Sequence, residues 1–212
     1  MNSKETWVER TDWRELIAVI LLSVTAILTA WSGFQASKWG GEMSIAFSKA
    51  SSARIQSVQV DGTANRKINV QVGLFSAWLQ GVASEDQELA DFLSKRFPEP
   101  LASAFTAWQA TEPFTNPDAP QSPFEMPEYQ VPEAAEADAL SAKADELFAT
   151  ALENNQRGDN YTLLAVAFAT VLFFAAISGR MRNRRSQWAT LGVGLVLFAA
   201  AATILLLLPK DF

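Results

Sequence analysis

Carboxylates are the only abundant side chains here that could serve acid or base chemistry near neutral pH. The chain has no cysteine and no histidine, against 23 aspartates plus glutamates. It therefore lacks thiolates and imidazoles, the commonest nucleophiles and metal ligands outside the carboxylates. No phosphate-binding glycine loop or nucleophile elbow occurs. The residue types thus predict a protein that is not an enzyme and uses no cofactor or metal.

The densest carboxylate group contains Glu85, Asp86 and Glu88. Such a group is consistent with a cation site, but acidic residues are also typical of the first turn of a helix, where they meet the positive end of the helix dipole. Residues 84–87 have the spacing of a capping box. We therefore favour a helix start over a cation site.

A second group of candidate residues carries hydroxyls within an apolar segment. Thr25, Thr29, Ser32 and Ala36 recur at helical spacing, so they share one face. A pore-facing or substrate-facing stripe is one interpretation. Close helix packing is the other, and we favour it because small and hydroxylated residues are enriched where membrane helices touch and no ionisable side chain joins this face.

A proline-rich segment, residues 112–132, contains a third candidate group. Its prolines forbid a helix and most strand pairing, so we expect an extended loop. Its apolar side chains are Phe114, Phe124, Met126 and Tyr129. We expect them to anchor the loop across neighbouring helices, with a partner-binding strap as the alternative.

Three uncharged runs must position these groups, and each is long enough to cross a bilayer as a helix. They cover residues 16–37, 160–179 and 186–209. About 20 apolar residues span a hydrocarbon core of roughly 30 Å. The sequence therefore predicts an all-α integral membrane protein with three transmembrane helices and a helical extramembrane domain that contains the proline-rich loop.

Basic residues predict the orientation of these helices. Arg180, Arg182, Arg184 and Arg185 lie in the link between the second and third runs, and more basic residues precede the first. Lysine and arginine favour the cytoplasmic side. We predict a cytoplasmic lead over 1–11, a first transmembrane helix over 12–37, a periplasmic or extracellular domain over 38–159, and a cytoplasmic link over 180–185. The second and third transmembrane helices are then 160–179 and 186–209.

The predicted outer domain is acidic and helical. Residues 38–159 hold eighteen acidic and nine basic residues, a balance of −9, which excludes nucleic acid as a partner. We expect one helix to stop near Asp61 and Gly62. Another, from 133 to 178, carries a seam at alternating spacings of three and four that packs on the chain's own helices or on a neighbouring copy. The seam consists of Ala137, Leu140, Ala144, Leu147 and Ala151.

The layout resembles a family of uncharacterised bacterial inner-membrane proteins with one N-terminal crossing, a helical outer segment and a C-terminal hairpin of two crossings. The resemblance is carried by residues 34–39 (FQASKW), 116–120 (NPDAP), 123–129 (PFEMPEY) and 173–178 (FFAAIS). It implies a bacterial inner-membrane setting and no catalytic residues.

Besides a membrane enzyme that uses carboxylates of the outer domain, which we do not favour, two functions remain open. The first is a non-enzymatic membrane scaffold or adaptor that associates with itself or docks a membrane-protein partner through the outer domain. The alternative is a homo-oligomeric cation channel lined by the Thr25 face beneath an acidic vestibule. In both, the lipid bilayer is the surrounding medium and a homo-oligomer is expected.

Overall fold

The computed structural model describes residues 13–210, apart from the side chain of Arg14. Its α-helices are α1 (Trp13–Ala83), α2 (Gln87–Ser94), α3 (Leu101–Gln109), α4 (Pro132–Ser178) and α5 (Arg184–Leu207), with one 3-10 turn, η1 (Pro123–Glu125). Over this range there is no strand, so the predicted all-α class is confirmed. Residues 1–11 and Asp12, the predicted lead and the predicted start of the first helix, lie outside the described range.

Three of these helices are long and apolar enough to cross a membrane: α1, α4 and α5. Each contains all or nearly all of one of the three uncharged runs, so the prediction of three helices of that length and composition is confirmed. The chain divides into two compact units, here called the three-helix unit (13–48 and 147–210) and the aromatic unit (49–146).

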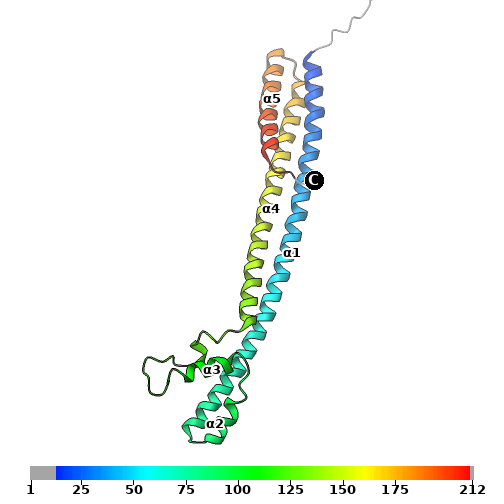
Figure 1. Cartoon of the computed structure of the whole chain (residues 1–212). Helices are drawn as coiled ribbons and strands as arrows, with labels where there is room; N and C mark the ends of the chain where they lie inside the picture. The colour runs from blue at the N-terminus through cyan, green and yellow to red at the C-terminus, as the bar shows by residue number, and fades with distance from the viewer. Residues whose placement is uncertain (1–12, 211–212) are drawn as a thin grey trace, which may run out of the picture. The chain divides into compact units, whose positions relative to one another are not determined.

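In the three-helix unit, the N-terminal part of α1, the C-terminal part of α4 and all of α5 lie side by side (Figure 1). Small residues allow close approach. A Cβ atom added at Gly158 of α4 would lie 3.5 Å from the Ala36 carbonyl oxygen of α1, and one added at Gly194 of α5 would lie 3.6 Å from the Phe174 Cβ of α4. Tyr161 and Phe168 are fully buried between the helices.

The aromatic unit has a different core. Ring contacts join Phe75 and Trp78 of α1 to Phe105 and Trp108 of α3, with the Trp78 and Phe105 centroids 4.8 Å apart. In Figure 1, α2 and α3 lie beside the last turns of α1. Burial of four large aromatic side chains is the main apolar contribution to this unit.

α1 and α4 also pack on each other within the aromatic unit. Ala53 and Ala64 of α1 and Ala137 and Ala144 of α4 are all buried. The Ser57 hydroxyl donates a 2.8 Å hydrogen bond to the Ala137 carbonyl. The seam residues Ala137 and Ala144 therefore pack on the chain's own α1.

The predicted helix stop near Asp61 and Gly62 is wrong, because α1 runs without interruption to Ala83. A glycine in a helix costs about 1 kcal/mol relative to alanine, and no proline occurs in α1. Burial of Ser57, Ala64 and Gln71 along one side of the helix offsets that cost.

Two other predicted boundaries differ in detail. The capping box over 84–87 is wrong: Asp86 is the N-cap of α2 and accepts a 3.0 Å hydrogen bond from the Leu89 backbone N–H. Glu85 instead takes φ = 58° at the end of α1. Arg184 and Arg185, predicted in the link, form the first turn of α5, so the link between helices is 179–183.

Candidate functional site

The hydroxyl face predicted on the first helix lies inside the three-helix unit. Thr25 and Ser32 are completely buried, while Thr29 and Ala36 are half-buried. The Thr29 hydroxyl donates to the Thr25 carbonyl and the Ser32 hydroxyl to the Leu28 carbonyl, both at 2.8 Å. These hydroxyls bond to their own helix, whereas the Thr25 hydroxyl, also buried, has no hydrogen-bond partner within the described residues.

The outside of the same unit is apolar. Ile27, Leu163 and Val196, one from each helix, are 68%, 67% and 71% exposed. Inside, Gln35 and Asn154 join Thr25 and Ser32 as buried polar residues. This distribution reverses the one expected in water, where large apolar side chains are buried and amides are exposed.

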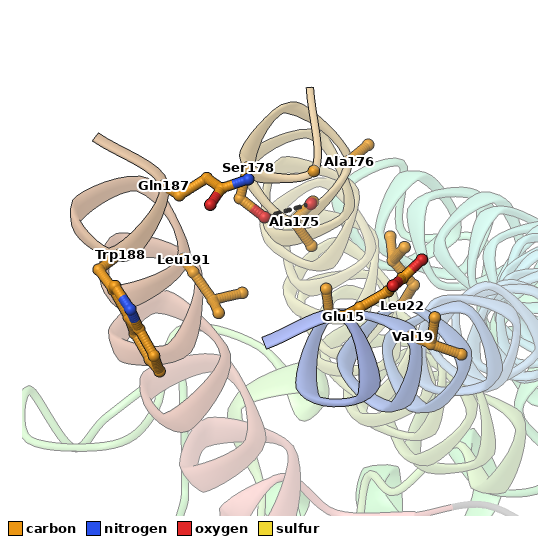
Figure 2. Close-up of a pocket in the computed structure, with 11 residues that line it drawn as sticks. Glu15, Val19, Leu22, Ala175, Ala176, Ser178, Gln187, Trp188 and Leu191 are labelled. Atoms are coloured by element: carbon orange, nitrogen blue, oxygen red, sulfur yellow. Dashed lines mark hydrogen bonds between the residues drawn. The ribbon is translucent and has the colours of Figure 1, made fainter. Parts of the chain in front are cut away.

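A cavity of about 330 Å³ opens at the end of the unit where α4 connects to α5. Figure 2 shows its lining side chains, with Leu191 of α5 pointing into the space between the helices and Gln187 extending towards Ser178 of α4. The Ser178 hydroxyl donates to the Ala175 carbonyl at 2.7 Å. Among the described residues that line the cavity, only Glu15 is charged.

One carboxylate, one amide and one hydroxyl do not form an acid and base pair or a nucleophile with its base. The sequence does not predict this cavity. Its lining residues come from three helices and have no common spacing in the sequence, so no motif marks them. In the sequence, Glu15 is simply the last charged residue before the apolar run over 16–37.

The four arginines predicted to set the topology occupy this same end. Arg180 and Arg182 lie in the link, and Arg184 and Arg185 in the first turn of α5. Asn183 caps that helix by accepting a 3.0 Å hydrogen bond from the Arg185 backbone N–H. Cations at a helix N-terminus oppose the helix dipole by about 0.3–1 kcal/mol each, so their position is not explained by helix stability.

The apolar side chains of the proline-rich segment divide into two sets. Phe124, Met126 and Tyr129 pack against the core of the aromatic unit, and the Phe124 ring lies edge-on to Phe75 at 5.6 Å. Trp108 fixes the segment by donating from Nε1 to the Pro120 carbonyl at 2.7 Å. Burial raises the pKa of Tyr129 above its ordinary value near 10. Phe114 also contacts the core, with its ring centroid 6.3 Å from that of Trp78 and 6.0 Å from that of Trp108, but it remains 66% exposed.

Ion pairs connect α1 to α4 in the aromatic unit: Arg54 with Asp145 and Lys67 with Glu133. Arg54 also donates to the Ser141 hydroxyl at 2.7 Å. The hydrogen bond from Lys67 holds the pKa of Glu133 below its ordinary value near 4.5. These charged side chains hold two helices together and do not converge on a cavity.

The other carboxylates of the described residues do not form a metal site. Across residues 13–210, no cluster of three or more aspartates and glutamates has the geometry to hold a metal ion. The acidic group at Glu85, Asp86 and Glu88 surrounds the start of α2, where Asp86 acts as its cap.

No protein-family model, curated protein or solved structure matches this chain. Function is therefore inferred from the buried polar side chains of the three-helix unit, its apolar exterior, the arginines at one end and the exposed surfaces of the aromatic unit.

Proposed function

We propose that the chain is a non-enzymatic integral membrane scaffold of the bacterial inner membrane, with the three-helix unit embedded in lipid. The observation that carries this proposal is the reversed polarity of that unit: Thr25, Ser32 and Gln35 are buried while Ile27, Leu163 and Val196 are exposed. In a bilayer, apolar side chains face lipid without cost, and polar side chains pack between helices.

The arginines support an orientation. Arg180 to Arg185 would lie at the cytoplasmic face, where anionic headgroups attract them and offset the unfavourable helix dipole at Arg184 and Arg185. Residues 38–159 would then be periplasmic or extracellular. The resemblance to uncharacterised inner-membrane proteins agrees with this setting.

The scaffold role is supported by the side chains on the surface of residues 38–159. Three of its carboxylates serve structure, Asp86 in a helix cap and Glu133 and Asp145 in interhelical ion pairs, while its exposed surface includes apolar side chains such as Val58 and Phe114. Exposed apolar groups on an otherwise acidic domain favour docking over chemistry. The channel alternative gains no support, because Thr25 and Ser32 are fully buried within one chain and leave no surface to line a pore between copies.

Two measurements test the proposal. Alkaline carbonate should leave the protein in the membrane pellet, because lipid surrounds three of its helices. In detergent, light scattering should give a protein mass above the 23.2 kDa of one chain, whether a second copy or another protein accounts for the excess. Release by carbonate, or a strict monomer with no associated component, would contradict the proposal.

A further inference from the structure

One face of α1 in the aromatic unit is left uncovered by the described part of the chain. Ile55, Val58, Val72 and Leu79 are 59%, 65%, 41% and 38% exposed. Between them, at the same alternating spacing of three and four, lie Gly62, Asn65, Asn69 and Ser76. We call these eight positions the outward face of α1. It extends over about 36 Å at 1.5 Å per residue.

The outward face is uncharged throughout, although the rest of the helix surface is not. The charged residues of α1 in this unit all lie off this line: Lys49, Arg54, Asp61, Arg66 and Lys67. The spacing places the outward face opposite the residues that pack on α4, such as Ser57 and Ala64. A solvated helix face would be expected to carry some of these charges.

We propose that a second copy of this chain covers the outward face, through a parallel, in-register pairing of the two α1 helices. This inference rests on the proposed function, because two copies inserted with the same orientation can be related only by an axis along the membrane normal. A spacing of three and four residues is the pattern of a two-stranded coiled coil, with Ile55 at an a position and Val58 at d.

The charges that flank the face agree with this partner. In a parallel two-stranded coiled coil, the residue directly before an a position (position g) faces the residue at position e of the next heptad in the other helix, five residues further along the sequence. Asp61 then meets Arg66 of the second copy, and this is the only such combination in the segment at which both residues are charged. Their charges are opposite. Neither residue forms an ion pair within its own chain among the described residues.

Polar residues within the face support register as well. Asn69 falls at an a position, where a single asparagine pairs with its equivalent and favours one alignment of the two helices. Gly62 allows close approach at the same level as the charged pair, because a Cβ there would meet only the Arg66 guanidinium, at 3.6 Å.

The natural absence of cysteine makes a position-specific test direct. We expect Asn69→Cys and Ile55→Cys each to form a disulfide-linked dimer in membranes under mild oxidation, since in-register a positions lie within the roughly 7 Å between Cα atoms that a disulfide requires. The matched control is Val70→Cys, on the adjacent position and 60% exposed but off the outward face, which should remain monomeric.

A charge-reversal series tests the pairing independently of cysteine chemistry. Asp61→Arg or Arg66→Asp alone should raise the dimer dissociation constant in detergent by about tenfold, because two opposite-charge contacts become like-charge contacts. The double variant should return it to within about twofold of the natural chain. Failure of the double variant to recover would overturn the proposal.

The remaining outcomes separate this inference from the proposed function. A membrane-embedded chain with no cross-linking at residues 55 and 69, or with equal cross-linking at residue 70, overturns the pairing alone. A different protein that shields the thiol of the Asn69→Cys variant from maleimide in a one-to-one complex also overturns it but leaves the scaffold role intact. Solubility without detergent overturns the scaffold role itself.

Discussion

At the scale of single residues, the polar side chains of this protein act mainly on structure. The hydroxyls of Thr29 and Ser32 donate hydrogen bonds to backbone carbonyls of their own helix. Asp86 caps α2, and Trp108 holds the proline-rich segment by a hydrogen bond to the Pro120 carbonyl. Each of these roles depends on a backbone partner, and no hydrogen bond links two of these side chains to form a reactive pair. The residue types in the sequence indicate which side chains can form such hydrogen bonds, but the partners depend on packing that spacing alone does not specify.

Thr25 gives the first prediction, because its buried hydroxyl has no partner within the described residues. Thr25→Val keeps the side-chain shape and removes the unpaired polar atom, so we expect stability to be unchanged or increased by about 1 kcal/mol. The measurement is the thermal unfolding midpoint in detergent. Thr29→Val, which removes a hydroxyl that does have a partner, serves as the comparison. A clear loss of stability in Thr25→Val alone would indicate that this hydroxyl has a partner in the working protein.

Glu133 gives a prediction of pH dependence. The Lys67 hydrogen bond lowers the pKa of Glu133 in the folded chain below its ordinary value near 4.5. The pair therefore stabilises the fold fully above that ordinary value, and the stabilisation is lost as the pH falls through the lowered pKa. The difference in thermal unfolding midpoint between the natural chain and the Glu133→Gln variant should be largest at neutral pH and should shrink towards pH ~3.

The control for this experiment is Glu136→Gln, an exposed glutamate one turn further along α4. The thermal unfolding midpoint of this variant should equal that of the natural chain at neutral pH and at pH ~3. A difference between the natural chain and Glu133→Gln that persists unchanged at low pH would contradict the role assigned to the Lys67 pair.

At the scale of elements, the sequence predicted the ends of α4 and α5 within a few residues, because a proline or a charge lies near each end. The end of α1 was missed at Asp61 and Gly62. Local propensity favours a stop there, but the buried small residues of α1 and α4 override it. This effect cannot be predicted from the α1 sequence alone, because it depends on contacts with α4.

The α1 and α4 seam gives the prediction at this scale. Ala144 is 1% exposed, so Ala144→Leu forces extra atoms into a packed contact and should destabilise the protein by about 1–3 kcal/mol. Ala142→Leu, on the same helix but exposed, should have little effect. Thermal midpoints measured by circular dichroism would compare them. Equal thermal midpoints for the two variants would contradict tight packing of α1 against α4 at Ala144.

At the scale of the whole molecule, the chain combines two compact units that differ in what they bury. The three-helix unit exposes many large apolar side chains and buries several polar ones, whereas the aromatic unit buries a cluster of large aromatic residues. Hydropathy predicted the three long apolar helices, but it did not predict the bounds of the two units. The cavity beside the arginines and the outward face of α1 became apparent only with the helices in place, because each depends on which surfaces neighbouring helices leave uncovered.

The central claim is that lipid surrounds the three-helix unit, with residues 180–185 and the proline-rich segment on opposite sides of the membrane. The single-cysteine variants Asp118→Cys and Arg182→Cys test it in a chain that has no cysteine of its own. With a membrane-impermeant maleimide on intact spheroplasts, the Asp118→Cys variant should be labelled at once and the Arg182→Cys variant only after permeabilisation. Labelling of both variants before permeabilisation, or protection of both, would contradict the account.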